Sequence, residues 1–552
     1  MSGGVDFGGA TYDSIPDMKQ TIHDYVIVGG GSAGCVLANR LSADPRISVL
    51  LLEAGGEANH PHVLVPAWST KLMGNRRWDW CYATQPDPSR NGRADLWPAG
   101  KVLGGGSSIN GMVYVRGHAG DYDDWSAAGN PAWGYAQCLP YFIRAERNNR
   151  FGGEFHGRAG PLGVESLRVT HPLNALFIQS CQAAGLPFNP DCNGAVQEGV
   201  GPMQATQHGG MRDSTARAYL APARGRTNLT VLTQATANRV LFEGRRAASV
   251  EYRHRGIAGL AAAAREVILC AGSLASPKLL MLSGLGPSDH LGAHGIACRV
   301  DLPGVGLHLQ EHPGVLVNFR MTVAALGHIA RSWWRLALAG LDYAVRRAGP
   351  ATSPVAHVVG YLKTDARLER PDIQLHFAPF AYQFEVDRVL VARDNRVGVA
   401  LNVCRPASRG SIELRDGDPG SAPIIRHQLL GARTDIERLI AAGRFVRRVF
   451  AASPLGPICD AETAPGLGVE TDAQWEHFVR ANAFPMYHPV GTCRMGTDRE
   501  SVVDQDLRVR GVTGLRVVDA SIMPSLVSAN TNAPVIMIAE KAADQIRRAA
   551  GS

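Results

Sequence analysis

A histidine followed by a proline stands in the late segment Tyr487-His-Pro-Val-Gly-Thr-Cys-Arg-Met-Gly. An imidazole takes up a proton near neutral pH, because its unperturbed pKa is about 6.5. Pro489 disfavours a helical conformation for the residue before it, so the ring of His488 is expected at a fixed angle on an extended backbone. A lone histidine more often serves packing, and the chain contains 18. His488 is therefore a candidate general base that requires support from the surrounding motifs.

A helix is predicted shortly after this histidine, over residues 533–548. Asn532 is the expected N-cap and Pro534 falls in the first turn, where proline is tolerated. The N-terminus of a helix carries roughly half a positive charge. It would therefore stabilise negative charge that develops on a ligand in front of it.

Three glycines spaced as Gly-x-Gly-x-x-Gly give the second chemical signature, at Gly29, Gly31 and Gly34. In this pattern the first glycine permits a tight turn, the second lets the backbone approach a pyrophosphate, and the third lets a helix pack on a strand. An acidic residue about 20 positions later typically accepts hydrogen bonds from a ribose. Glu53 stands at that distance.

The elements around these glycines complete a βαβ unit. Residues 25–28 and 49–52 are short apolar runs typical of buried strands, and residues 33–43 have a helical pattern between them. The helix N-terminus would offer its free N–H groups to phosphate. The alternative is a glycine-rich turn followed by an exposed acid. It would not explain why the glycines, the strands, the helix and the acid follow one another at these spacings, so the sequence predicts a bound dinucleotide.

Length and composition limit the number of domains, the kinds of partner and the cellular location. A chain of 552 residues is too long for one hydrophobic core, so at least two domains are expected. The net charge is +7, but the basic residues are scattered, and no nucleic-acid partner is expected. Ten cysteines without a Cys-x-x-Cys pair suit reduced thiols, and residues 1–19 lack an apolar signal core. No apolar run is long enough to span a membrane, so a cytoplasmic enzyme is predicted.

An amphipathic helix is expected over residues 333–345. Its apolar residues include Trp333, Trp334 and Leu341, and four arginines lie beside them at positions 331, 335, 346 and 347. Peripheral contact with a membrane surface stays open. The favoured interpretation is a helix that covers a substrate cavity, with its apolar residues used for packing.

Five motifs together resemble the glucose–methanol–choline (GMC) oxidoreductase family, and the likeness runs from about residue 24 to 547. They are GGGSAG at 29–34, GKVLGGGSSINGM at 100–112, GSLASPKLLMLSGLG at 272–286, YHPVGTCRMG at 487–496 and VVDASIMPSLVSANTNAP at 517–534. The resemblance implies an FAD-dependent enzyme that oxidises alcohols. Its catalytic pair falls on His488 and Asn532, and no metal is expected. The implied flavin contacts are Gly29, Gly31, Ser32, Gly34, Glu53, Ala54, Gly106, Asn110, Gly111, Met112, Asp519 and Ala520.

The resemblance also implies the architecture, an α/β protein with a Rossmann-type FAD-binding domain and an interleaved α+β substrate-binding domain on an antiparallel sheet. The FAD-binding domain is expected in three parts, residues 22–165, 226–313 and 482–552, the last carrying the catalytic residues. Residues 314–481 are expected to form the substrate domain. Residues 166–225 are expected to be mixed and to contribute to it.

The chemistry agrees with the family. Alcohol oxidation removes a hydroxyl proton, which a neutral His488 can accept, and a hydride, which goes to flavin N5. Asn532 would hold the hydroxyl, and its helix would face the flavin's pyrimidine edge. Some relatives attach the flavin to a histidine where this chain has Ile109, so a non-covalent FAD is predicted. The chain departs from the family pattern in two other motifs. Ala99 stands where relatives usually have an arginine, and His308-Leu-Gln-Glu-His312 stands where they usually have Asn-Leu-x-Asp-His.

The favoured function is oxidation of a primary alcohol to an aldehyde, with a quinone, a cytochrome or O₂ as the electron acceptor. An O₂-using oxidase, a choline dehydrogenase, a flavin photodecarboxylase-like activity using Cys404 and a non-catalytic flavin protein are alternatives. Choline-acting relatives carry a glutamate in the substrate domain where this chain, by the resemblance, has His357. That residue and Phe484 are assigned to the substrate pocket, and the apolar neighbours favour an uncharged alcohol.

Overall fold

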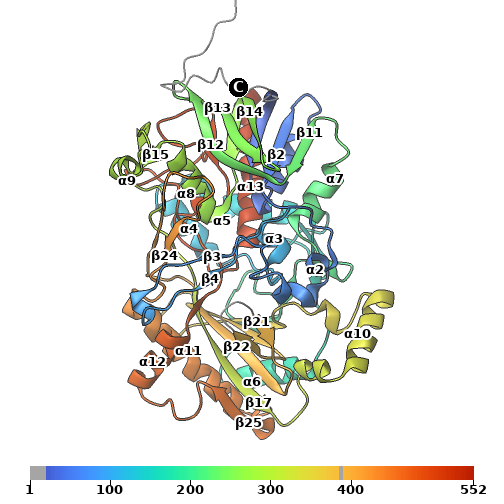
Figure 1. Ribbon diagram of the computed structural model, residues 1–552. Coiled ribbons are helices and arrows are strands. Elements are labelled where there is room, and N and C mark those ends of the chain that lie inside the picture. Colours follow the sequence, from blue (N-terminus) through green and yellow to red (C-terminus); the bar gives the residue numbers. More distant parts are fainter. Residues whose placement is uncertain (1–19, 385–388, 552) are drawn as a thin grey trace, which may run out of the picture.

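The computed structural model describes residues 20–384 and 389–551. Two seven-stranded sheets organise the chain, one in the upper and one in the lower half of the molecule (Figure 1). The first and the last strand of the upper sheet, β1 (Gln20–Val28) and β27 (Leu515–Val517), lie almost 500 residues apart in the sequence, and both pair with β14 (Ile257–Leu269). The upper half is therefore assembled from both ends of the chain.

The upper sheet has a parallel centre and an antiparallel edge. β2 (Val49–Glu53) lies between β1 and β11 (Leu229–Thr233), and all these pairings are parallel. β12 (Ala235–Glu243) and β13 (Arg246–His254) extend the sheet as antiparallel strands beyond β14. Every residue of β2 is buried, as expected for a parallel strand covered on both faces. This arrangement confirms the predicted Rossmann-type half of the protein.

Helices from distant parts of the sequence cover this sheet. α1 (Ser32–Leu41) packs against α13 (Asn532–Gly551), and α13 packs against α5 (Tyr135–Ala145). An ion pair ties the first two together, because Arg40 donates to the buried carboxylate of Glu540 at 2.7 Å. Other helices of this half are α2 (Pro61–Leu64), α3 (Gly106–Ile109), α4 (Ala119–Ala127), α8 (Gly272–Leu282) and α9 (Ser288–Ala293).

The lower sheet is antiparallel throughout, as predicted for the substrate domain. In spatial order it contains β25 (Cys459–Ala464), β17 (Pro313–Met321), β22 (Arg396–Val403), β19 (Ile373–Ala378), β18 (Val358–Leu362) and β7 (Gly199–Pro202), and β26 (Phe484–Pro485) pairs with β17. β7 comes from the segment expected to be mixed. The domain boundaries themselves stay a prediction.

Side chains of β19 point alternately to the two faces of this sheet, one of which packs against helices while the other lines a cavity. Phe377 stacks on Phe177 of α6 (Pro172–Ala183) with ring centroids 4.2 Å apart. α11 (Arg433–Ala451) covers the same face, and α12 (Asp472–Asn482) packs on α11. His376 and Ala378, one residue to either side of Phe377, line a cavity on the opposite face. Successive side chains of a strand point to opposite faces, so one short strand serves both the core and the site.

The amphipathic segment forms α10 (Trp333–Arg346), at the lower right edge of the molecule in Figure 1. The expectation that its apolar residues pack over a cavity is wrong. Tyr343 is its only buried residue, whereas Trp333 is 81 % exposed and Val345 is 73 % exposed. The helix meets the rest of the protein along one narrow strip, which leaves its apolar side uncovered.

Within the described residues, no helix has the combination of length and apolar character that crossing a bilayer requires.

Candidate active site

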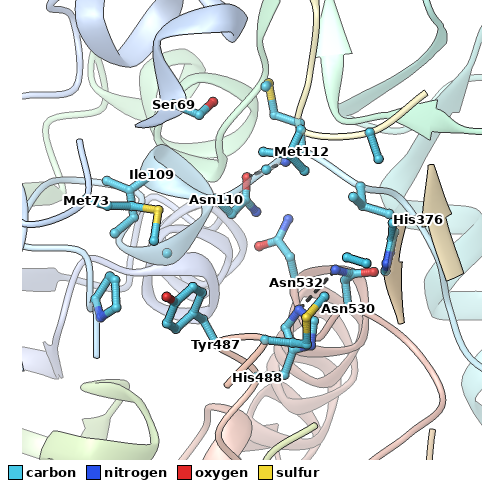
Figure 2. A pocket seen from close by; sticks show the side chains of 18 of the residues that line it. Ser69, Met73, Ile109, Asn110, Met112, His376, Tyr487, His488, Asn530 and Asn532 are labelled. Atoms are coloured by element: carbon cyan, nitrogen blue, oxygen red, sulfur yellow. Dashed lines mark hydrogen bonds between the residues drawn. The ribbon is translucent and has the colours of Figure 1, made fainter. Parts of the chain in front are cut away.

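A cavity of about 310 Å³ lies between the two halves of the protein (Figure 2). Its walls come from α1, α3 and the N-terminus of α13 on one side, and from β17, β19 and β22 on the other. Its labelled polar side chains include Asn110, His376, His488, Asn530 and Asn532. The segments identified from sequence therefore meet around one space.

His488 is held by a second histidine that sequence analysis did not identify. Its Nδ1 lies 2.9 Å from Nδ1 of His312, and the two rings are nearly perpendicular, with an interplanar angle of 83°. The other ring nitrogen of His312, Nε2, lies 3.0 Å from the carbonyl oxygen of Cys404. A carbonyl can only accept, so Nε2 of His312 must carry the proton.

This contact fixes the protonation of the whole chain of groups. With its proton on Nε2, a neutral His312 offers a lone pair at Nδ1, which accepts from the Nδ1–H of His488. The lone pair of His488 is then on Nε2, toward Asn530 and the cavity (Figure 2). We call Cys404 carbonyl, His312 and His488 the histidine relay. It presents His488 in the tautomer that a proton acceptor requires.

The amide partner of His488 is Asn530, which corrects the expected pairing with Asn532. Nδ2 of Asn530 lies 3.0 Å from Nε2 of His488 and donates to it. The carbonyl of Asn532 instead accepts from Ser32 Oγ at 2.9 Å. Both asparagines line the cavity, but the two-residue separation directs them to different neighbours at the start of α13.

Burial sets the electrostatics of the relay. Desolvation lowers the pKa of His488 well below its usual value, and the imidazoles of His312 and His376 lower it further. Burial likewise lowers the pKa of His312 to about 3 and that of His376 to about 4. All three rings are therefore neutral at physiological pH, as the tautomer assignment requires.

A buried acid supports the backbone behind the relay. Glu311 accepts from the backbone N–H of His488 at 2.7 Å and from that of His312 at 2.9 Å. Its burial, opposed by these hydrogen bonds, raises its pKa to about 8. Glu311 thus fixes the two histidine-bearing segments relative to each other.

The glycine loop in front of α1 fits a dinucleotide. A Cβ on Gly34 would lie 1.9 Å from the carbonyl oxygen of Gly29, and one on Gly29 would lie 2.5 Å from that of Cys270. These glycines are required by packing. A Cβ on Gly31, by contrast, meets no atom closer than 3.8 Å, and the N-terminus of α1 has no side-chain cap. Open space in front of free N–H groups suits a pyrophosphate.

Sequence models of the GMC oxidoreductase family match residues 23–314 and 406–539. The chain belongs to the GMC oxidoreductase family. It is 43 % identical over 96 % of both chains to an alcohol dehydrogenase [acceptor] of Pseudomonas putida, and 42 % identical to a mitochondrial choline dehydrogenase of Homo sapiens, over 95 % of this chain and 90 % of that one.

Solved structures give the same fold. The crystal structure of pyridoxine 4-oxidase from Mesorbium loti superposes with a TM-score of 0.86 at 32 % identity, covering 95 % of this chain and 99 % of that one. GMC oxidoreductases are FAD enzymes, and the cofactor of this protein is therefore FAD.

Several of the predicted FAD contacts line the cavity of this GMC oxidoreductase, namely Ser32, Gly106, Asn110, Gly111 and Met112. The carbonyl of Asn110 accepts from the Met112 N–H at 3.0 Å and from the buried Arg212 at 2.8 Å. Its amide NH₂ is thereby left for a ligand. Through the Ser32–Asn532 hydrogen bond, the N-termini of α1 and α13 also converge on this space.

Two predicted contacts are acids that hold the protein's own backbone. The carboxylate of Glu53 accepts from the N–H groups of Gly30 at 2.8 Å and Gly55 at 2.7 Å, and burial raises its pKa to about 7. Asp519 accepts from the Gly272 N–H at 2.9 Å and from the Ser276 hydroxyl at 2.6 Å. Glu53 therefore shapes the glycine loop, while Asp519 joins the start of α8 to the segment before α13.

The two residues assigned to the substrate pocket, His357 and Phe484, differ in their position relative to the cavity. Phe484 lines the cavity, but His357 does not. Nδ1 of His357 bonds to Asn174 at 3.1 Å and Nε2 bonds to Ser353 at 2.8 Å, and burial lowers its pKa to about 3. His357 is a neutral core residue, and its neighbours Val355 and Ala356 supply the cavity wall instead.

The side chain of Ile109 lines the cavity, whereas that of Cys404 does not. Cys404 is fully buried and reaches the site only through its backbone carbonyl, which accepts from His312. Burial raises the pKa of its thiol well above the usual range. Ile109 lines the cavity, and its side chain has no nucleophilic atom.

Proposed function

We propose that this GMC oxidoreductase oxidises an uncharged primary alcohol to an aldehyde, with His488 as the general base. The observation that carries the proposal is the histidine relay, which leaves the lone pair of His488 Nε2 in the cavity. A base placed in this way typically contributes about 10²–10⁴ in rate. Bound FAD supplies the acceptor for the hydride that leaves the carbinol carbon.

Each polar group of the cavity has a task in this scheme. In the structure Nδ2 of Asn530 donates to Nε2 of His488 at 3.0 Å. The bound alcohol takes the place of this amide, so that Nε2 accepts the hydroxyl proton and the amide NH₂ of Asn530 hydrogen-bonds the substrate oxygen. Asn532 and Ser32 hold the two helix N-termini together at the cofactor side. The proposed FAD-binding set consists of the predicted contacts that line the cavity together with Gly29, Gly31, Gly34, Glu53, Ala54, Asp519 and Ala520.

Anaerobic flavin reduction by a panel of alcohols tests this function. We expect bleaching of the oxidised flavin spectrum by at least one primary alcohol, followed by reoxidation with a quinone, a cytochrome or O₂ supplied separately. An unchanged spectrum with every alcohol would disprove the proposal.

The ten free cysteines support the proposed cytoplasmic location, because reduced thiols persist in that compartment.

The substrate is expected to be uncharged, and choline is expected to react poorly. None of the described residues that line the cavity is acidic, and much of its wall is apolar, including Leu316, Val355 and Val389. A quaternary ammonium ion needs negative charge or an aromatic cage to replace its hydration. In stopped-flow experiments at equal concentrations, benzyl or medium-chain alcohols should reduce the flavin faster than choline.

Choline oxidation is the second candidate. Tyr382, Phe484 and Tyr487 line the cavity, and aromatic rings can bind a quaternary ammonium ion. Relatives at 40–42 % identity are named choline dehydrogenases. Faster flavin reduction by choline than by the uncharged alcohols would establish this candidate in place of the first.

The FAD is expected to dissociate when the protein is denatured. Ile109 has no nucleophilic atom to bond the isoalloxazine ring. Acid precipitation should therefore leave the yellow colour in the supernatant, with FAD identified there by its mass. A yellow pellet carrying a flavin-linked peptide would contradict the prediction, and mass mapping of that peptide would locate the link.

A further inference from the structure

The exposed side of α10 is apolar over most of its length. At about 100° per residue, Trp333, Trp334, Leu338, Leu341 and Val345 fall within an arc of about 140°. Each is exposed, from 49 % for Trp334 to 81 % for Trp333. The buried Tyr343 faces a different direction, toward the body of the protein. This arrangement reverses the usual one, in which the apolar side of an amphipathic helix faces the core.

Positive charge borders the apolar side. Arg331, Arg335, Arg346 and Arg347 lie on or next to α10, and Asp342 is the single acid among them. Asp342 lies 3.4 Å from Arg346, and the guanidinium group of Arg335 lies 5.1 Å from the ring centre of Trp334. An apolar strip that contains tryptophan and is bordered by arginines is typical of helices that lie in the headgroup region of a bilayer.

The position of α10 connects it to the cavity. The helix packs on η6 (Pro350–Thr352), and η6 packs on η1 (Pro66–Lys71). Ser69 and Thr70 of η1 line the cavity, as does Val355 shortly after η6. β21 (Val389–Val391) packs on η1, contributes Val389 to the wall and exposes Leu390. α10 therefore stands beside one rim of the active-site cavity.

We propose that α10 binds the surface of an anionic phospholipid bilayer, with its apolar side among the acyl-chain boundary and its arginines at the phosphate level. Charge complementarity decides this occupant, because a positively charged border suits anionic lipid headgroups and disfavours an identical border on a second copy of the chain. Binding in this orientation brings the cavity rim to the membrane, where apolar alcohols and lipid-soluble electron acceptors concentrate.

Vesicle flotation of the full-length, FAD-loaded protein tests the proposal. Binding should be strong to phosphatidylcholine vesicles containing about 30 % phosphatidylglycerol, about tenfold weaker to phosphatidylcholine alone, and weaker in high salt. Trp333→Ser with Leu341→Ser should reduce binding about tenfold or more. Ile257→Ser with Leu467→Ser is the matched control, because these residues are 73 % and 69 % exposed on other parts of the surface.

Charge reversal gives an independent readout. Arg335→Glu with Arg346→Glu should abolish the preference for anionic vesicles, whereas Arg367→Glu with Arg499→Glu, which changes the net charge equally, should retain it. All variants should reduce their flavin with a water-soluble alcohol at the wild-type rate, which separates this proposal from the proposed function.

Two results would overturn the proposal. The first is a wild-type protein that floats with neither vesicle at low salt. The second is binding that Trp333→Ser with Leu341→Ser leaves unchanged while light scattering shows a dimer turning into a monomer, because a second copy would then cover α10.

Discussion

Replacing His488 by alanine should slow flavin reduction by alcohol by about 10²-fold or more while FAD remains bound. The variant loses the lone pair at Nε2 that accepts the hydroxyl proton. The residues proposed to hold FAD are unchanged, so the flavin spectrum of the variant should match that of the wild type. Stopped-flow reduction at saturating alcohol measures the effect directly.

Asn530→Ala and Asn532→Ala serve as comparisons. Each should reduce the rate less than His488→Ala, because they remove positioning groups and leave the base in place. Asn530→Ala should have the larger effect on the chemical step, since Asn530 contacts Nε2 of His488 and Asn532 contacts Ser32. Wild-type reduction rates in His488→Ala would show that the proton is accepted elsewhere.

Substitution of His312 should have the second-largest effect, about 10- to 10²-fold on kcat with little change in KM. His312 lies behind His488 and acts by keeping the proton of His488 on Nδ1. Without an acceptor there, the Nδ1–H of His488 is buried without its partner, and the ring is free to take the other tautomer, in which Nε2 cannot accept a proton.

Two amide substitutions divide the functions of His312. His312→Asn places a carbonyl oxygen close to the position of Nδ1, so it retains the acceptor for His488. His312→Gln places an amide nitrogen close to the position of Nε2, so it retains the donor to Cys404 and loses that acceptor. His312→Asn should therefore reduce flavin faster than His312→Gln or His312→Leu. Equal losses in all three variants, with unchanged thermal stability, would contradict the relay.

The dinucleotide half of the protein was predictable because its requirements are local. Gly29, Gly34 and the strands on either side are constrained by contacts that a short sequence pattern records. The antiparallel substrate sheet followed from the family resemblance. His488, predicted to be the general base from its motif and the proline that follows it, lies in the cavity wall, and its role stays a prediction.

The remaining site residues depend on contacts between distant segments. Asn-Thr-Asn at 530–532 offers two amides, and only the packing of α13 against α1 shows which one meets His488. His312 lies 176 residues from its partner, so no local pattern reveals the relay. His357 was misassigned because the residue that lines a wall depends on the direction of each side chain, and the chain turns Val355 and Ala356 toward the cavity instead.

Contacts between segments far apart in the sequence determine when the site can form during synthesis, because a chain leaves the ribosome from its N-terminus onward. Ser32 meets its partner Asn532, and Arg40 meets Glu540, only after 500 further residues have been synthesised. Until then, α1 lacks the helix against which it packs, and β14 lacks β27. A nascent chain therefore cannot assemble the catalytic cavity before β27 and α13 have been synthesised. Chains that terminate before residue 530 lack Asn530 and Asn532 of the site and cannot turn over.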